Sequence, residues 1–316
     1  MEKEQVIIRE VCPRDGWQNL PFIETERKKA LIAELLQCGI PELEATSFVS
    51  PKWTPQMRDA DAVAAWTMEA AAAAPRRVRI SALVPNEKGA ARAVAAGVDA
   101  VDIVMSISEY NNKMNLNMSV EESFEQVKKI SALCRDRIAV RITFACVFGA
   151  YEGDPVDWDK LAAYGEACAG MGIERISVAD SSGLAGPEEM RRVLRRMKAA
   201  VEQKALAVHI HDTRGLGILN CYSAYTEGVR QFDTALGGLG GCPFLPGASG
   251  NVSTEDSVRM FSMLGAETGI NLDQLIGVGE KMHASVSGRY NSKLLDIALL
   301  GREKACSQQR DPMRKE

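Results

Sequence analysis

The chain has 316 residues, a formal net charge of −4 at pH 7, 46% apolar and 25% charged residues, which is an ordinary globular composition. The acidic balance argues against nucleic-acid binding, and no apolar run approaches the roughly 18 residues that a membrane-spanning helix needs. The eight cysteines include no CxxC pair, which predicts free thiols rather than disulfides. The N-terminal segment is charged and unlike a secretion signal, which predicts a cytoplasmic location.

Short β-branched runs alternate with helical patterns along the chain. The first run is followed by a helix with Thr25 as its expected N-cap, and Pro75 ends a later alanine-rich helix. Another helix is expected to begin at Pro187, with two glutamates in its first turn and an apolar stripe. The eight expected strands are 6–11, 42–48, 77–83, 100–107, 137–146, 175–181, 206–212 and 232–238.

Eight strands alternating with helices predict a single domain with the (β/α)8 fold, the TIM barrel, over about residues 5–264. Further helices are expected over about residues 265–305, followed by a polar, frayed tail at 306–316. A doubly wound open sheet is the alternative. It is disfavoured because the first strand is followed by CPRDGWQNL rather than by a glycine-rich nucleotide-binding turn.

Polar residues gather at the expected carboxyl ends of the strands, where a barrel carries its chemistry. His209 and His211 are two residues apart on one strand, so both imidazoles point to the same face. With Asp15 and an amide from the glycine-rich stretch 237–251, they predict an open metal site for Mg²⁺ or Mn²⁺, with Zn²⁺ less favoured. The alternative is a pair of hydrogen-bonded histidines in the barrel mouth.

Three charged residues near these ends have competing interpretations. Arg14, beside Asp15, could form a surface ion pair or could stabilise a developing oxyanion. Glu44 lies inside an apolar strand and needs a partner, for which Arg14 is the obvious residue. Asp180 follows the sixth strand and could serve in catalysis or cap the helix that begins at Pro187.

Four segments, from the first strand to the helix after the eighth, carry a family resemblance. They are PRDGWQN, LEATSFVSPKWTPQM, HIHDTRGLG and GLGGCPFLPGASGNVSTED, and they span about the first 280 residues. Together they resemble the 3-hydroxy-3-methylglutaryl-CoA lyase family of metal-dependent barrels. RDG and HxHD alone would also fit the isopropylmalate and citramalate synthases, whereas the cysteine-bearing glycine loop and SFVSPKW are specific to the lyases.

The resemblance implies a retro-Claisen cleavage of a 3-hydroxyacyl-CoA ester into acetyl-CoA and a 3-oxo acid, in a protein expected to form a homodimer or higher homo-oligomer. Arg14 would stabilise the enolate and contact the substrate, and Cys242 would lie on a loop that closes over it. His209 is a candidate base. The implied metal ligands are Asp15, His209, His211 and Asn251. Glu44 and Gln18 would support the site. The candidate catalytic or substrate-contacting residues are thus Arg14, Gln18, Glu44, His209 and Cys242, together with Asp180, which rests on its place at the end of the sixth strand rather than on the resemblance.

The sequence also departs from the family pattern. Trp17 stands where a small aliphatic residue is common, and residues 20–22 (LPF) stand where a lysine that touches CoA often occurs. These departures keep open a different 3-hydroxyacyl-CoA, or a hydroxy acid without CoA, as the substrate. A synthase or aldolase of the same barrel group and a catalytically silent barrel are the competing functions. Arg289 and Lys293 are candidates for the CoA phosphates, or part of a solvated helix face.

Overall fold

In the computed structural model, which describes residues 3–241 and 250–310, eight parallel strands close into a barrel. Each strand pairs with the next one in the sequence, and β8 pairs with β1 to complete the ring. The predicted (β/α)8 fold is therefore confirmed. The strands are β1 (Ile7–Glu10), β2 (Glu42–Ser47), β3 (Arg79–Leu83), β4 (Ala100–Ser106), β5 (Ala139–Ala145), β6 (Arg175–Asp180), β7 (Leu206–Ile210) and β8 (Gln231–Thr234).

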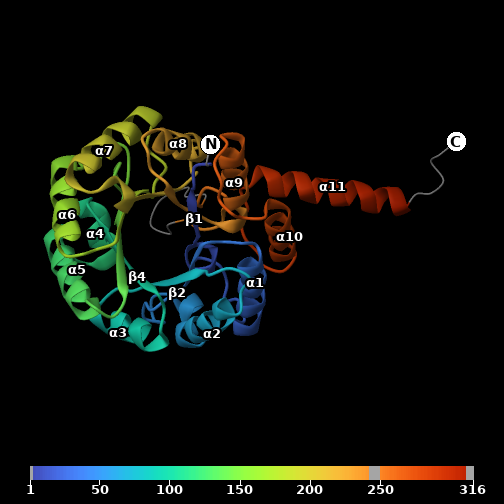
Figure 1. The fold of residues 1–316 in the computed structure, drawn as a ribbon, viewed down its shortest axis with the longest axis horizontal. Coiled ribbons are helices and arrows are strands. Elements are labelled where there is room, and N and C mark those ends of the chain that lie inside the picture. The colour runs from blue at the N-terminus through green and yellow to red at the C-terminus, as the bar shows by residue number, and fades with distance from the viewer. Residues whose placement is uncertain (1–2, 242–249, 311–316) are drawn as a thin grey trace.

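Helices surround the strands as an outer ring, as Figure 1 shows. Short helical turns η1 (Cys12–Gly16), η2 (Pro55–Met57), η3 (Gln203–Ala205) and η4 (Leu236–Gly238) interrupt the connections. The described helices are α1 (Thr25–Gln37), α2 (Ala60–Ala72), α3 (Glu87–Ala96), α4 (Glu109–Leu116), α5 (Val120–Cys134), α6 (Trp158–Gly170), α7 (Pro187–Ala200), α8 (Gly217–Thr226), α9 (Thr254–Met263), α10 (Leu272–His283) and α11 (Lys293–Arg310).

The last two strands end earlier than the sequence predicts. β7 stops at Ile210, and His211 instead forms an isolated antiparallel bridge with Asn251. β8 stops at Thr234 because the chain turns into η4, where Gly237 has a φ of 66° that a side chain would disfavour. Both changes occur where the barrel opens, so the residues just beyond the strands are free to pair with one another.

The helix boundaries mostly follow the sequence signals. Pro187 is the first residue of α7, as expected, and the predicted apolar stripe of that helix is buried. The prediction of Thr25 as an N-cap is wrong, because α1 begins at Thr25 and the capping position is Glu24. The Thr25 hydroxyl instead donates a hydrogen bond to Asp59, at 2.9 Å.

The C-terminal part of the described chain is helical. Figure 1 shows α11 projecting away from the barrel beyond α9 and α10. This helix continues to Arg310, so the expected boundary between helix and frayed tail at residue 305 is too early. Ile297 and Leu300 on α11 are more than half exposed, at 65% and 56%. None of the helices in the described part is long and apolar enough to cross a membrane.

The barrel interior carries buried charges. Arg9 of β1 and Arg141 of β5 are each 2% exposed. Arg9 pairs with Asp102 at 2.6 Å and with Asp233 at 2.7 Å, and Arg141 pairs with Glu42 at 2.7 Å. Buried charges are costly unless they are paired, so the pairing within this connected network offsets the cost of burying them inside the barrel.

Two buried carboxyl groups, Glu10 and Glu255, lie outside that network where β1 meets η4. Glu10 accepts hydrogen bonds from the Cys12 and Leu236 backbone N–H groups at 2.8 and 3.0 Å, and Glu255 accepts from the Gly237 N–H at 3.0 Å. Burial raises the pKa of Glu10 to about 7 and that of Glu255 to about 8.

The raised pKa values of Glu10 and Glu255 predict a pH-dependent stability. Because the folded pKa exceeds the unfolded one, their contribution is fully present below pH 4.5 and is lost as the pH rises through about 7 to 8. Each pKa unit corresponds to about 1.4 kcal/mol, so a loss of several kcal/mol is expected. Urea unfolding at pH 5 and pH 9 should show this loss, and Glu255→Gln should reduce it. Equal pH dependence in the two proteins would contradict the prediction.

Candidate metal centre

Arg14 and Asp15 lie in the tight turn η1 that directly follows β1. The Val11 carbonyl oxygen accepts hydrogen bonds from the Arg14 and Asp15 N–H groups at 3.1 and 2.7 Å, which wraps the chain over the end of the strand. Gly16 permits this wrap, because a Cβ there would lie 2.8 Å from the Cys12 sulfur. The turn buries both charged side chains, with Arg14 7% and Asp15 4% exposed.

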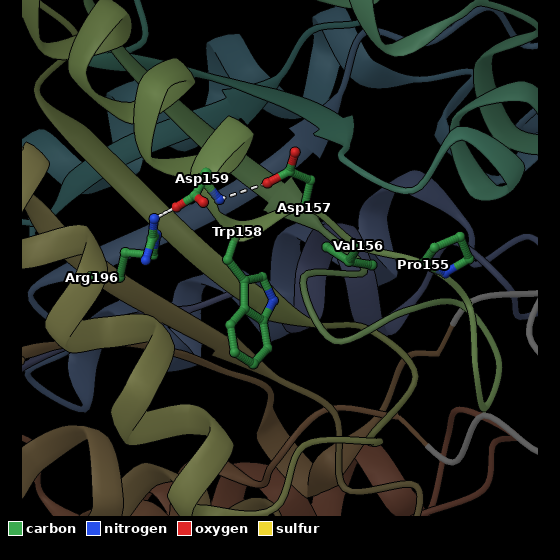
Figure 2. Close-up of a pocket in the computed structure, with 6 residues that line it drawn as sticks. All are labelled: Pro155, Val156, Asp157, Trp158, Asp159 and Arg196. Atoms are coloured by element: carbon green, nitrogen blue, oxygen red, sulfur yellow. Dashed lines mark hydrogen bonds and ion pairs between the residues drawn. The ribbon is translucent and has the colours of Figure 1, made fainter.

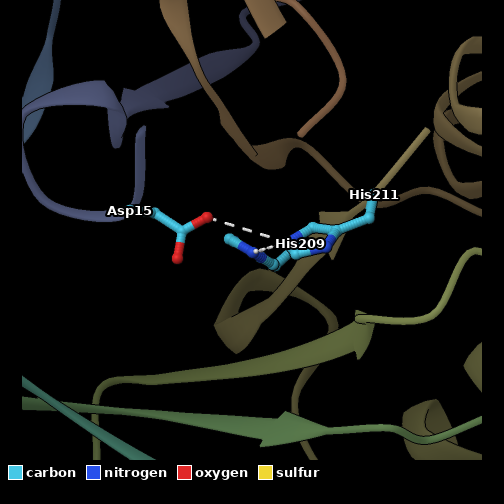
Figure 3. Close-up of side chains that lie close together, drawn as sticks. All are labelled: Asp15, His209 and His211. Atoms are coloured by element: carbon cyan, nitrogen blue, oxygen red, sulfur yellow. Dashed lines mark hydrogen bonds and ion pairs between the residues drawn. The ribbon is translucent and has the colours of Figure 1, made fainter. Parts of the chain in front are cut away.

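His209 and His211 meet Asp15 across the barrel opening. The Nε2 atoms of the two histidines are 3.1 Å apart, and His211 Nε2 lies 3.7 Å from Asp15 Oδ2. Figure 3 shows the two rings and the carboxylate pointing toward one another, with His209 on β7, His211 just after it and Asp15 in η1. One ligand atom from each of the three residues lies within 4.8 Å of the others, and all three residues are buried. The arrangement can hold a metal ion.

Asn251 completes this group of side chains. Its Nδ2 donates hydrogen bonds to Asp15 Oδ2 at 2.5 Å and to the Leu239 carbonyl at 2.9 Å. Its Oδ1 is buried and has no hydrogen-bond partner among the described residues. A buried amide oxygen without a partner is costly unless a ligand satisfies it, so this atom fits a cation-binding role.

Gly240 packs directly against the site. A Cβ at this position would lie 2.8 Å from Asp15 Oδ2 and closer still to Asn251 Nδ2, and the φ of 118° is itself unfavourable for a side chain. Gly240→Ala should therefore weaken metal affinity about tenfold or more by displacing Asn251 and Asp15. Calorimetric titration with Mn²⁺ measures this, and Gly265→Ala, which has a similar positive φ and open space around it, is the control. An equal loss in the two variants would contradict the prediction.

Hydrogen bonds from neighbouring residues hold Asp15 ionised and fixed. Arg14 Nη1 donates to Asp15 Oδ1 at 2.5 Å, and Gln18 Nε2 donates to the same oxygen at 2.7 Å. Burial alone would raise the pKa of the Asp15 carboxyl, but Arg14 and the two histidines outweigh it and hold that pKa well below its usual range. Asp15 is therefore a carboxylate ready to accept a cation.

Glu44 contacts Arg14, the partner that the sequence analysis predicts for it. Arg14 Nε donates to Glu44 Oε2 at 2.8 Å, and Glu44 is fully buried. Burial raises the pKa of Glu44, against the opposing effect of Arg14 and Arg9. Two nitrogens of the Arg14 guanidinium are thus held, by Glu44 and by Asp15, which fixes the plane of the group.

The donor set and the charge around the cluster fit a divalent cation. Imidazole nitrogens with carboxylate and amide oxygens suit Mg²⁺, Mn²⁺ or Zn²⁺. Carboxyl groups also outnumber guanidinium groups in the connected buried network, so a divalent cation would offset the excess negative charge. The carboxyl groups are Asp15, Glu42, Glu44, Asp102 and Asp233, and the guanidinium groups are Arg9, Arg14 and Arg141.

Asp180, at the end of β6, stabilises the turn that leads to α7. Its carboxylate accepts hydrogen bonds from the Leu184 and Ala185 N–H groups at 2.9 and 3.1 Å, and burial raises its pKa to about 6. It does not cap α7, whose N-cap is Gly186, with the Gly186 N–H donating to Glu189 Oε2 at 3.1 Å, so that alternative is wrong. It also lies outside the cluster of Asp15 and the two histidines. A catalytic role for Asp180 stays a prediction.

The remaining predicted residues lie elsewhere. Cys242 falls in residues 242–249, outside the part of the chain that is described. Arg289 is exposed in the segment between α10 and α11 rather than on a helix face, and Lys293 is the exposed first residue of α11. The roles of all three residues stay predictions.

The sequence analysis missed Asp233, which lies on β8 beside His209 of β7. Its Oδ2 is 3.4 Å from His209 Nδ1. The signal was present, because a single aspartate within the strand FDT resembles the glutamate of ELEATS that drew attention to Glu44.

A separate surface pocket lies at the start of α6 and beside α7. Figure 2 shows its lining, in which Asp159 forms an ion pair with Arg196. The Trp158 ring nitrogen donates to the Val147 carbonyl at 2.9 Å, so this polar atom is already satisfied. None of the cluster residues lines this pocket, and it is assigned no role. Its lining residues are Pro155, Val156, Asp157, Trp158, Asp159 and Arg196.

Comparisons with known proteins agree with this arrangement. The HMGL-like family model matches residues 5–282. The mitochondrial hydroxymethylglutaryl-CoA lyase of Gallus gallus is 40% identical over 298 residues, covering 93% of this chain and 98% of that protein. The (R)-citramalyl-CoA lyase of Chloroflexus aurantiacus is 35% identical over 290 residues, covering 90% of this chain and 92% of that protein.

A solved structure extends the comparison to three dimensions. It is an HMG-CoA lyase from Acinetobacter baumannii in complex with coenzyme A and 3-methylmalate, and it superposes with a TM-score of 0.85 at 36% identity. The match covers 92% of this chain and 94% of that one. Since one family model spans the barrel and these relatives align over most of their length, the chain belongs to the HMGL-like family of lyases.

Proposed function

We propose that this protein is a divalent-metal-dependent carbon–carbon lyase that cleaves a 3-hydroxy-3-methylglutaryl-CoA-like ester into acetyl-CoA and a 3-oxo acid. Acetoacetate is the 3-oxo acid expected from the parent substrate. The observation that carries the proposal is the convergence of Asp15, His209 and His211, with Arg14 next to them, at the opening of the barrel. Membership of a family of lyases supports the same reaction class.

The proposed cleavage breaks the bond between C2 and C3 of the substrate. When bound, the cation would act as a Lewis acid that makes the 3-hydroxyl easier to deprotonate. A base removes the hydroxyl proton, C3 becomes a ketone carbon, and the electron pair of the broken bond passes to C2 as the enolate of acetyl-CoA. Arg14, held in place by Glu44 and Asp15, offsets the enolate charge. A proton then adds at C2.

The proton donors and acceptors are assigned on different grounds. Cys242 is proposed as the donor to C2, on the family resemblance alone. His209 is a weaker candidate for the base, since its two ring nitrogens already face Asp233 at 3.4 Å and His211 at 3.1 Å. It could accept a substrate proton only by releasing one of these contacts. We propose Asp15, His209, His211 and Asn251 as the metal ligands, with Mg²⁺ or Mn²⁺ as the cation.

A second candidate is a lyase of the same family with a different acyl group. Two departures from the family pattern favour it. Trp17 is buried, at 1% exposure, directly after the Arg14–Asp15–Gly16 turn, where a large ring replaces a small side chain. Residues 20–22 (LPF) stand where a CoA-contacting lysine is expected, and the Phe22 ring stacks with the Arg58 guanidinium, at 3.3 Å from the ring centroid. The citramalyl-CoA lyase relative supports this variation in the acyl group.

A substrate panel tests both candidates. The purified protein with Mg²⁺ or Mn²⁺ is incubated with 3-hydroxy-3-methylglutaryl-CoA, citramalyl-CoA and the corresponding free acids, and acetyl-CoA, acetoacetate and pyruvate are measured. We expect acetyl-CoA release that chelator stops and metal restores, and the 3-oxo or 2-oxo product identifies the acyl group. No cleavage of any compound would overturn the proposal. Consumption of acetyl-CoA with pyruvate or 2-oxoisovalerate would instead establish a synthase.

We also propose a cytoplasmic homo-oligomer. Leu216, Leu219 and Tyr222 near and on α8 are 37%, 43% and 39% exposed, and this apolar surface supports association with a second copy. Analytical ultracentrifugation would measure the mass in solution, and a purely monomeric protein would contradict the oligomer.

A further inference from the structure

Asp233 lies beside His209 inside the barrel. The two residues are paired neighbours in the register of β7 and β8, so their side chains point to the same face of the sheet. Asp233 is 1% exposed, and its Oδ2 lies 3.4 Å from His209 Nδ1. The opposite ring nitrogen, Nε2, faces His211 at 3.1 Å. The imidazole of His209 therefore stands between a buried carboxylate and the candidate metal site.

Two arginines hold this carboxylate in place by hydrogen bonds, an arrangement that we call the clamp. Arg9 donates to both oxygens, from Nε to Oδ1 at 2.9 Å and from Nη2 to Oδ2 at 2.7 Å, and Arg141 Nη2 donates to Oδ1 at 3.3 Å. Arg9 is itself held by Asp102 at 2.6 Å. A carboxylate paired with two guanidinium groups accepts hydrogen bonds and donates none. The hydrogen shared between Asp233 and His209 must therefore be on the histidine.

The position of that hydrogen decides which histidine nitrogen can bind a cation. A neutral imidazole carries one N–H, so a hydrogen at Nδ1 leaves the lone pair of Nε2 pointing at His211 and Asp15. His211 differs, because its Nδ1 is buried with no hydrogen-bond partner among the described residues. Of the two histidines, only His209 thus has a carboxylate beside Nδ1, the ring nitrogen that points away from the candidate metal site.

We propose that Asp233, clamped by Arg9, is a positioning residue that fixes His209 with its hydrogen on Nδ1 and its Nε2 lone pair toward the metal. The inference rests on the proposed function only for the metal, because the clamp and the tautomer are properties of the protein alone. Carboxylates that hold a metal-binding histidine typically change metal affinity about 10- to 100-fold when they are replaced.

The first test is metal affinity in two matched variants. Asp233→Asn should weaken Mn²⁺ binding about 10- to 100-fold in calorimetric titration, because the amide can donate to Nδ1 and favour the wrong tautomer. The control is Asp102→Asn, which removes a carboxylate of similar burial from the same Arg9 but touches neither histidine. It removes the same unit of negative charge from the buried network, so an effect of charge alone appears in both variants, and its own loss of affinity should stay well below that of Asp233→Asn. Equal affinities in the two variants, weakened or not, would overturn the inference.

The second test needs no metal. The chain has three histidines, so the ring-nitrogen NMR signals of His209 in the metal-free protein can be assigned by their loss in His209→Ala. We expect the Nδ1–H tautomer in the wild type and a mixture or the Nε2–H tautomer in Asp233→Asn. If that variant does not fold, Arg9→Lys keeps the carboxylate but breaks the two-point clamp and should shift the same signals. An unchanged tautomer in the folded variant would overturn the inference.

The two tests separate this inference from the proposed function. If the wild type neither binds metal nor cleaves any ester, the proposed function fails, while the tautomer measurement still decides whether Asp233 positions His209. If the wild type is active and Asp233→Asn behaves like Asp102→Asn, the inference fails and the proposed function stands.

Discussion

Asp15→Asn should lower turnover by about three orders of magnitude and remove most of the affinity for divalent cations. The Asp15 carboxylate contacts Arg14, Gln18 and Asn251 at 2.5 to 2.7 Å and lies 3.7 Å from His211 Nε2. The amide keeps the shape of the side chain but loses the charge that attracts a cation and Arg14. A Lewis-acid contribution of several kcal/mol corresponds to this change in rate.

Acetyl-CoA release and calorimetric titration with Mn²⁺ measure the two effects of Asp15→Asn. The control is Glu10→Gln, which neutralises another buried carboxyl on the same strand–turn unit, bonded to backbone N–H groups and to Thr254. This control should keep both metal affinity and turnover within a few-fold of wild type. If Asp15→Asn retains wild-type metal affinity, Asp15 is not a ligand and the proposed site is wrong.

Arg14→Lys should lower kcat about 10²- to 10³-fold while metal affinity stays within a few-fold of wild type. The guanidinium of Arg14 bonds to Glu44 and Asp15 through two different nitrogens, at 2.8 and 2.5 Å. A lysine ammonium is a point charge that cannot reproduce this planar pair of contacts. Loss of one donor to a developing oxyanion has an effect of this size in other enzymes.

The control for Arg14→Lys is the same substitution in another arginine–carboxylate pair, which lies away from the site. Arg79 forms a two-point pair with Glu174, at 2.5 and 2.6 Å, and Arg79→Lys should leave kcat unchanged. Steady-state kinetics with the best ester of the panel separates kcat from KM in both variants. A normal kcat in Arg14→Lys, or an equal loss in both, would contradict the role of Arg14 at the enolate.

The sequence predicts the barrel well because each unit carries its own local signals. Eight β-branched runs are enough to predict the strands, and Pro187 correctly marks the start of α7. Local signals fail where a distant residue competes for a side chain. Thr25 is a good N-cap by type, yet its hydroxyl bonds to Asp59 in the turn before α2, which spacing along the chain does not reveal.

The site is predictable only in part for the same reason. The spacing of His209 and His211 fixes their shared face, and strand ends of a barrel converge, so Asp15 could be expected nearby. Asp15 and Asn251 are in contact although they lie 236 residues apart in the chain. This contact depends on barrel closure and on the absence of a side chain at Gly240. No local pattern predicts how closely such segments approach.

The two ends of the glycine-rich segment are tied to the barrel independently of what lies between them. The Asn251 N–H donates to the Leu239 carbonyl at 3.4 Å, the Asp212 N–H donates to the Gly250 carbonyl at 2.9 Å, and His211 bridges to Asn251. The backbone of Asn251 is therefore held by the residues at the ends of the strands and of η4, so the position of this proposed ligand depends on the barrel itself. Substitutions in residues 243–249 should leave Asn251 in place, whereas Cys242, the proposed proton donor, has to be kept for turnover. Metal binding and proton donation are thus expected to be separable by mutation.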